Sequence, residues 1–171
     1  MRKLGIATAF ALAAGLAFGG ATLASGDDGE GSAHGRGGRT FTIYAPTAAN
    51  RIAFLPETAG KFSLGDRVVF SDDLFTSKGG ESLGIDGGVC TVVRIADATT
   101  NSGVLQCNIT FSLPDGQIAT QELHTLTNGE LTGTQPGAIT GGTGRYRDAA
   151  GQVSVEFLST TEAFITFMLD G

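Results

Sequence analysis

An acidic side chain on an apolar strand face is the first candidate for chemistry in this sequence. Within residues 67–75, a period of two places four side chains on one face of a strand: Val68, Phe70, Asp72 and Leu74. Burial raises the pKa of a carboxyl group and lets it donate or accept a proton near neutral pH. The alternative is that the strand ends near Ser71 and leaves Asp72 and Asp73 in a solvated turn. On the first interpretation, Asp72 is the candidate catalytic residue.

The two cysteines form a second candidate constellation. Cys90 and Cys107 lie on neighbouring predicted strands, and the midpoint between them falls in the predicted turn at residues 97–101. They can therefore lie opposite each other on one face of the sheet. If the protein is exported, this placement favours a disulfide, which would stabilise the fold by about 3 kcal/mol through loop closure. The alternative is a free thiol in a pocket.

A glycine-dense run, Gly141-Gly142-Thr143-Gly144, resembles a phosphate-binding loop at first sight. It lacks the Gly-Lys-Ser/Thr end of such a loop, and no helix pattern follows it to supply the amino-terminal N–H groups that bind phosphate. The run therefore predicts a tight turn between strands. The sequence also lacks the Gly-x-Ser-x-Gly and His-Glu-x-x-His motifs, and with only two histidines no metal site is expected.

These side chains must be positioned by strands. The chain is rich in Gly, Thr, Val, Ile and Phe, has no Trp, and shows little helical periodicity, which predicts an all-β fold. Strands are expected at residues 41–44, 52–55, 67–75, 89–95, 105–113, 117–126, 153–158 and 164–169. Short strands with turns between them predict a sandwich or a barrel. Because exposed strand edges promote aggregation, closure into a barrel is the expected form.

The hairpin after residue 113 sets which side chains face inward. Pro, Asp and Gly follow Leu113, and they predict a bulged hairpin that pairs Leu113 with Gln117. In this register Gln121 shares the face of Ile109 and Cys107 and points into the interior.

The amino-terminal residues predict an exported protein. Arg2 and Lys3 precede an uncharged apolar run, and small residues near Ala24 suit a signal-peptidase site. A membrane anchor is the alternative, but the glycines and the small-residue end favour cleavage. We expect a signal peptide at residues 1–24, a flexible Gly-rich linker at 25–39 and a single barrel domain at 40–171 in a secreted, extracytoplasmic protein.

The charge of the chain limits its partners. Its formal net charge is −6, and the part after residue 24 is more acidic still because Arg2 and Lys3 precede that position. An acidic protein is a poor partner for nucleic acid or for an anionic membrane surface. We therefore expect no nucleic acid partner, and no membrane contact after removal of the signal peptide.

Three blocks in this order resemble the allene oxide cyclase and dirigent superfamily. They are GDRVVFSDDLF at residues 65–75, GIDGGVCTVV at residues 84–93, and GGTGRYRDAAGQV at residues 141–153. The resemblance covers residues 40–171. It implies an eight-stranded antiparallel, calycin-like barrel with an apolar cavity and no cofactor, assembled as a homotrimer.

The resemblance also implies roles for particular residues. Plant allene oxide cyclases convert an unsaturated fatty-acid epoxide into a cyclopentenone, and dirigent proteins guide the coupling or cyclisation of phenolic intermediates. In both, the barrel holds a reactive apolar molecule in one conformation. The match implies that Tyr44, Cys90 and Gln121 line the cavity and that Asp72 stands at its polar position. The Glu that follows a Tyr in the first strand of the cyclases is replaced by Ala45.

Two functions follow as expectations. In the first, the barrel binds a small, largely apolar molecule and orients it for cyclisation or isomerisation, and Asp72 places or protonates it. In the second, the chain is a non-catalytic carrier or structural barrel, in the manner of lipocalins. The carboxylate missing at Ala45 and the expected disulfide, which would remove the thiol of Cys90, favour the second.

Overall fold

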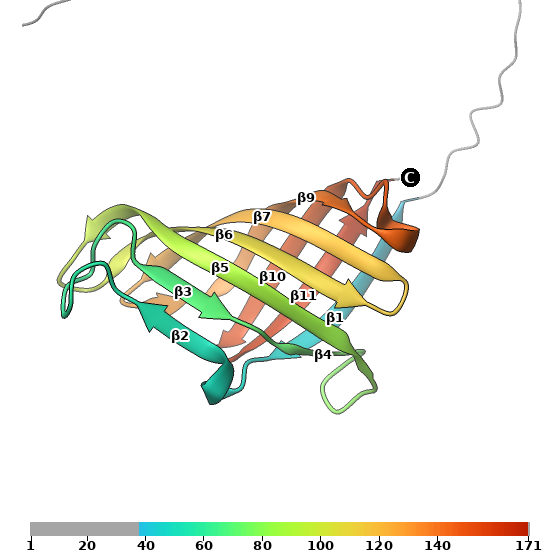
Figure 1. Ribbon diagram of the computed structural model, residues 1–171, viewed down its shortest axis with the longest axis horizontal. Coiled ribbons are helices and arrows are strands. Elements are labelled where there is room, and N and C mark those ends of the chain that lie inside the picture. Colours follow the sequence, from blue (N-terminus) through green and yellow to red (C-terminus); the bar gives the residue numbers. More distant parts are fainter. Residues whose placement is uncertain (1–37, 171) are drawn as a thin grey trace, which may run out of the picture. The chain divides into compact units, whose positions relative to one another are not determined.

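The computed structural model describes residues 38–170, which form a barrel of β-strands (Figure 1). The predicted signal peptide at residues 1–24 lies outside the described residues, as do residues 25–37 of the predicted linker. No helix of the described part is long and apolar enough to cross a membrane.

The barrel is built from 11 strands and two 3₁₀ helices. The strands are β1 (Arg39–Pro46), β2 (Ile52–Leu55), β3 (Arg67–Phe70), β4 (Asp73–Phe75), β5 (Ser82–Asp97), β6 (Ser102–Leu113), β7 (Gly116–Thr127), β8 (Glu130–Leu131), β9 (Gly133–Gly142), β10 (Gly151–Ser159) and β11 (Glu162–Leu169). The 3₁₀ helices are η1 (Ala49–Arg51) and η2 (Gly144–Tyr146). Each expected strand is present, and the one expected at residues 67–75 is divided into β3 and β4.

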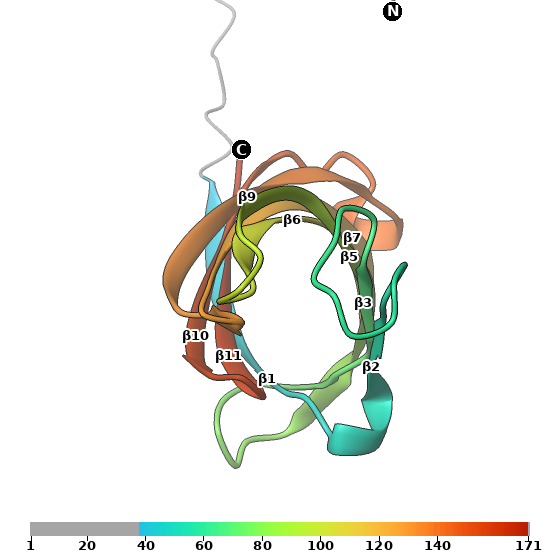
Figure 2. The same cartoon turned by 90° about the vertical axis from the view of Figure 1, so that its left-hand side faces the viewer.

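The strands form one antiparallel sheet that closes on itself (Figure 2). Their order is β2-β3-β5-β4-β1-β11-β10-β9-β7-β6, and the pairing of β6 with β5 completes the ring. β1 and β2 are two parts of one interrupted strand, as are β3 and β4, and β8 is a short extension paired with β7. The prediction of a closed eight-stranded antiparallel barrel is confirmed.

A disulfide joins β5 to β6 across the inner face of the sheet. Cys90 pairs directly with Cys107, and their Cα atoms lie 4.0 Å apart. Both side chains are buried inside the barrel. The structure therefore has the predicted Cys90–Cys107 disulfide rather than a free thiol.

The turn between β6 and β7 is tighter than expected. Leu113 pairs with Gly116, so the predicted pairing of Leu113 with Gln117 is wrong by one residue. Gly116 has a φ of 140°, and a Cβ atom there would lie 2.1 Å from the carbonyl oxygen of Thr143. Glycine lets the chain close this turn and approach the neighbouring loop at the same point.

The shift of one residue turns the side chains of β7 to the other face. Gln121 lies opposite Asn108 and is exposed on the outside, so its predicted inward position is wrong. Glu122 and His124 point inward instead, and each is only 2% exposed.

Aromatic side chains fill the half of the barrel next to η2. The ring of Phe167 stacks on Phe41 at a centroid distance of 4.9 Å and meets Phe111 edge-on at 4.9 Å. Tyr146 of η2 lies 6.3 Å from Phe41 and is buried at the end of the barrel. Such ring pairs add about 1 kcal/mol each beyond the burial of their area. This half of the interior is solid.

The glycine run is a turn, as predicted, and it packs against the β6–β7 turn. The amide of Arg145 donates to the carbonyl oxygen of Asp115 at 2.8 Å, and its guanidinium lies 3.4 Å from the Asp115 carboxylate. Gly144 has a φ of 59°, and a Cβ atom there would lie 2.4 Å from the same carbonyl oxygen. The run therefore ties two loops together.

β9 crosses the sheet between β7 and β10 although it contains Pro136. The pairing of β9 with β7 ends at Gly137, so Pro136 lies just beyond the segment that pairs with β7, although it still lies opposite Ser154 of β10. There the side-chain amide of Gln135 replaces the backbone: it accepts a hydrogen bond from the Thr125 amide at 2.6 Å and donates to the Thr125 carbonyl at 3.1 Å. The missing N–H of proline therefore costs no bond to β7.

Replacing both cysteines (Cys90→Ala with Cys107→Ala) should lower the free energy of unfolding by about 3 kcal/mol, because the unfolded chain regains the entropy that the cross-link removes. Urea unfolding of the two proteins measures the difference. Thiol titration of the unreduced, denatured wild-type protein should find no free thiol, and two reactive thiols would contradict the cross-link.

Candidate functional site

The half of the barrel away from η2 holds a cavity of about 270 Å³. Its wall is mostly apolar, and the larger side chains in it are Phe70, Leu105, Ile109, Phe111, Phe157 and Ile165. Exposed residues of the β7–β8 turn and of the β10–β11 hairpin complete the lining and form its mouth. A largely apolar space of this size, open at its mouth, suits a small organic molecule.

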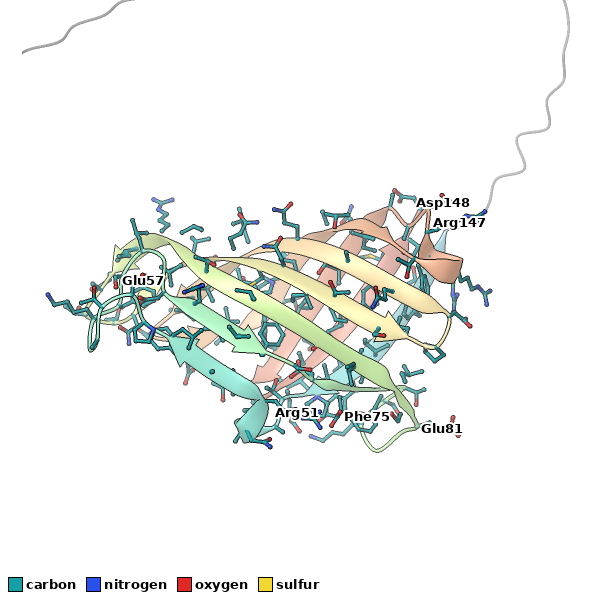
Figure 3. All side chains as sticks on the ribbon, in the orientation of Figure 1. Arg51, Glu57, Phe75, Glu81, Arg147 and Asp148 are labelled. Carbon is teal, nitrogen blue, oxygen red and sulfur yellow. A yellow bond between two sulfur atoms is a disulfide. The ribbon has the colours of Figure 1, made fainter. Side chains whose placement is uncertain are left out.

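A second hollow of about 610 Å³ adjoins the cavity, next to the loop between β2 and β3. The two spaces share Val68, Leu105, Leu126 and Gly129 in their linings. Glu57 of this loop lies at one end of the barrel, and Arg147 and Asp148 lie at the other (Figure 3).

Asp66 anchors the loop between β2 and β3. Its carboxylate accepts hydrogen bonds from the amides of Glu57 and Ser63, each at 2.8 Å. Burial acts to raise the pKa of Asp66, but the hydrogen bonds from Ser63 and Glu57 outweigh it and hold the pKa below the usual value. The loop is thus fixed by an ionised side chain that is fully buried.

Asp72 lies at the interruption between β3 and β4, and its side chain lines the cavity. It is only 6% exposed. Each alternative from the sequence is therefore half right: the strand breaks near Ser71, yet Asp72 is buried on the inner face. Asp73 behaves differently, since its carboxylate is exposed and forms an ion pair with Arg51 at 2.5 Å.

Asp86 of β5 forms hydrogen bonds with the backbone of Asp72 at the interruption between β3 and β4. Its carboxyl group accepts a hydrogen bond from the Asp72 amide at 2.8 Å, and its own amide donates to the Asp72 carbonyl at 3.0 Å. Ser71 adds a bond from its hydroxyl to the Asp86 carbonyl at 2.5 Å. The side chain of Asp86 thus stands in for a backbone acceptor that the broken strand lacks.

Both aspartates hold their protons more tightly than usual. Burial raises the pKa of Asp72, with a smaller contribution from Asp73, while Thr47 and Arg51 act in the opposite direction. Burial also raises the pKa of Asp86, to about 8, and the charges of Asp72 and Glu122 add to the effect. The cavity wall can therefore supply or accept a proton near neutral pH.

A second polar pair enters the interior from β7. His124 Nε2 lies 2.6 Å from Glu122 Oε2, and the Thr120 hydroxyl donates to Glu122 Oε1 at 2.7 Å. The other ring nitrogen of His124, Nδ1, lies 3.8 Å from the sulfur of Cys107. Because a disulfide sulfur carries no proton, Nδ1 is the only possible donor in that contact. The short Nε2–Oε2 contact places the two ionisable side chains directly side by side.

Gly137 of β9 makes room for this pair. A Cβ atom at this position would lie 2.2 Å from Cγ of Glu122 and 2.9 Å from a methyl group of Val153. No real side chain tolerates such contacts without movement of its neighbours. The absence of a side chain at Gly137 therefore lets Glu122 lie flat against the wall.

The residues expected at the site divide into three groups. Asp72 and Cys90 line the cavity, although Cys90 offers a disulfide sulfur rather than a thiol. Ala45 also lines the cavity, so no carboxylate enters it from this position of β1. Gln121, as described, lies outside.

Tyr44 does not line the cavity, contrary to expectation. It lies on the outer face of β1, where its hydroxyl donates to Glu162 at 2.5 Å and Lys78 lies 5.7 Å from its ring centroid. The loop between β4 and β5 carries Lys78 and buries Tyr44 from outside. Burial here reflects a covering loop and not an inward orientation.

Asp86, Glu122 and His124 were not expected at the site. Asp86 could have been found by continuing the alternation of Cys90 back along β5. Glu122 and His124 share one face of β7, but the register error at the preceding turn placed that face outside. Among residues 38–170, no group of three or more His, Cys, Asp or Glu side chains is placed to hold a metal ion.

Asp86→Asn should flatten the pH dependence of stability. The folded-state pKa, about 8, lies above the unfolded value, so the stability linked to Asp86 is complete below about pH 4 and is lost as the pH rises to about 8. In that window wild-type stability should fall by up to about 1.4 kcal/mol per pH unit relative to the variant. Asparagine keeps an oxygen to accept the Asp72 amide.

Urea unfolding of both proteins between pH 4 and pH 9 measures this difference. Asp73→Asn is the matched control, because it removes an exposed neighbouring carboxylate and should leave the slope unchanged. Parallel curves for the wild type and Asp86→Asn would contradict the assignment.

Comparison with known proteins agrees with this architecture. The family model described as "Allene oxide cyclase barrel like domain" matches residues 47–169. A solved structure of a pyocyanin demethylase has a TM-score of 0.63 and 25% identity, covering 76% of this chain and 99% of that chain.

Two further solved structures have the same fold at lower identity. One is the pterocarpan synthase dirigent protein PsPTS1, with a TM-score of 0.60 and 17% identity, covering 80% of this chain and 95% of that chain. The other is a Diels–Alderase from Streptomyces koyangensis, with a TM-score of 0.59 and 15% identity, covering 82% of this chain and 72% of that chain. Since the family model spans most of the barrel and the solved structures share its architecture, the chain belongs to the allene oxide cyclase barrel-like family.

Proposed function

We propose that this protein binds a small, largely apolar molecule inside the barrel and rearranges it by orientation and proton transfer, as a cofactor-independent cyclase or isomerase of dirigent type. The observation that carries the proposal is the set of ionisable side chains in the wall of a largely apolar cavity: Asp72, Asp86 and His124, with Glu122 buried behind His124. Enclosing such groups costs free energy, which a purely structural interior would avoid.

The roles of these groups follow from their positions. Asp72 faces the ligand space with a raised pKa, so it is placed to give a proton to the ligand or to take one from it. The His124 ring lies in the same wall, and Glu122 contacts it from behind at 2.6 Å. The apolar rings around them would exclude water and hold the ligand in one conformation, which supplies the larger part of the rate.

The related proteins support a small-molecule reaction within this type of barrel. The names of the solved structures describe a demethylase, a dirigent protein and a Diels–Alderase. Pyocyanin, a small planar heteroaromatic compound, is therefore the first substrate to test on this chain, followed by phenolic and polyene compounds.

A non-catalytic carrier is the second candidate. Two observations favour it: Ala45 brings no carboxylate into the cavity, and the disulfide removes the thiol of Cys90. A carrier would use the apolar wall alone, and the buried polar groups would then serve only to hold the strands together.

Asp72→Asn should separate the two functions. In the proposed enzyme, this change should lower turnover by at least about 100-fold while ligand binding persists, because the amide fills the same space but cannot exchange the proton. The measurement is liquid chromatography coupled to mass spectrometry of each test compound after incubation with the protein, because an isomeric product has the same mass as its substrate and must be separated from it. Asp73→Asn should retain full turnover, since its side chain faces outward.

A carrier would give a different result in the same experiment. It would retain a stoichiometric ligand and return it unchanged, with equal behaviour of the wild type and Asp72→Asn. Loss of turnover in Asp73→Asn as well would show that the variants act through stability and would count against the role of Asp72.

We also propose that the mature protein is exported and trimeric. The signal-like amino terminus supports export, and so does the disulfide, which forms in oxidising compartments.

Exposed apolar side chains on the outer faces of β3 and β5, such as Val69 and Val89, support an interface between barrels. The secreted protein should begin near Ser25 by intact-mass measurement and have three times the chain mass by light scattering. A cytoplasmic chain that begins at Met1, or a monomer, would contradict these proposals.

A further inference from the structure

The charged groups that line the cavity are nearly all acidic. Its lining contains four carboxyl side chains and no Lys or Arg. The acidic residues are Asp72, Asp86, Glu130 and Glu162, and His124 is the single basic side chain in the lining. His124 is already engaged by Glu122 at 2.6 Å, so it does not balance the aspartates.

The carboxylates at the mouth and those within the wall differ in their partners. Glu162 meets Lys78 at 3.0 Å on the outer face. Asp72, in contrast, is 6% exposed, and its Oδ1 atom has no hydrogen-bond partner among the residues that the structure describes. A buried carboxyl oxygen without a donor is unfavourable. A positive charge in the cavity beside Asp72 would therefore compensate this carboxyl group in a way that the described residues, apart from the Thr47 hydroxyl, do not.

The remaining walls would favour the same kind of ligand. Phe70, Phe111 and Phe157 contribute rings to the cavity. The face of an aromatic ring attracts a cation, by about 0.5–2 kcal/mol depending on desolvation. A carboxylate ligand would find neither a cation to pair with nor a cluster of free donors.

We propose that the cavity selects small organic cations, which carry a protonated or alkylated nitrogen on an apolar frame, and excludes carboxylates. The nitrogen lies beside the Asp72 carboxyl group, and the apolar frame lies among the phenylalanine rings. This inference rests on the proposed function, because it names the ligand class of the same cavity.

Binding of a cation is then linked to release of a proton. Asp72 and Asp86 bind protons more tightly than usual in the empty cavity, because burial disfavours their charged forms. A bound cation stabilises the ionised carboxylate, so a proton leaves to solvent as the ligand enters. The groups that face this pair are Asp73 and Arg51 from the β2–β4 side and Glu122 from β7. Glu122 is held by His124, and Arg51 by Asp73.

Three probes of matched shape test the proposal by equilibrium dialysis with ultraviolet detection. They are 1-methylquinolinium (cation), 1-methylnaphthalene (neutral) and 1-naphthoate (anion). At pH 8 the cation should bind at least about tenfold more tightly than the neutral compound, and the anion should not bind. Between pH 6 and pH 9 the affinity for the cation should rise, and the affinity for the neutral compound should stay constant.

Asp72→Asn should remove the preference for the cation and leave the neutral probe bound. Asp148→Asn, which removes an exposed carboxylate at the opposite end of the barrel, should behave as the wild type. The three-probe comparison and its pH dependence need no variant, so they decide the question even if Asp72→Asn does not fold.

The outcomes separate this inference from the proposed function. Equal affinity for the cation and the neutral probe, tighter binding of the anion, or an equal effect of both variants would overturn the cation preference while leaving an apolar cavity intact. No binding of any probe would overturn the proposed function and this inference together.

Discussion

The pairing of Leu113 with Gly116 decides which side chains of β7 the barrel encloses. Side chains alternate along a strand, so this single pairing sends the whole even-numbered set inward. Ile118 enters the filled half, whereas Glu122 and His124 enter the hollow half. The polar part of the site is thus fixed by a two-residue turn at the far end of its strand. A longer turn by one residue would present Gln121 and Leu123 to the ligand instead.

A closed sheet leaves little water for the polar groups inside it, so those groups must satisfy one another. The Asp86 carboxyl holds the Asp72 amide, and Thr120 and His124 hold Glu122. These contacts offset part of the cost of burial and also fix the groups in place. The disulfide and the packed rings at the other end supply a rigid frame around them. The interior therefore has a part that aromatic rings fill and a part that holds the cavity with its buried ionisable groups.

Local patterns in the sequence predicted much of this molecule. Period-two alternation identified the strands, the barrel and the inward face of Asp72, and the cysteine spacing identified the disulfide, because each depends on a few neighbouring residues. The errors concern contacts between distant segments. An error of one residue in the expected β6–β7 register placed Glu122 and His124 on the outer face. Tyr44 is buried by the loop between β4 and β5, and the alternation of residues along a strand does not predict such a contact. β9 was not expected from the sequence, because it contains Pro136 and several glycines, and its pairing with β7 and β10 makes it a strand.

Two glycines shape the cavity through the side chains that they lack. A Cβ atom at Gly88 would lie 2.6 Å from the ring of Phe70, and one at Gly137 would lie 2.2 Å from Glu122. Most hydrogen bonds between the strands join backbone atoms, so a side chain at either position would first displace Phe70 or Glu122 and change the shape of the interior. A barrel of this kind can therefore acquire a new ligand through single substitutions in its lining.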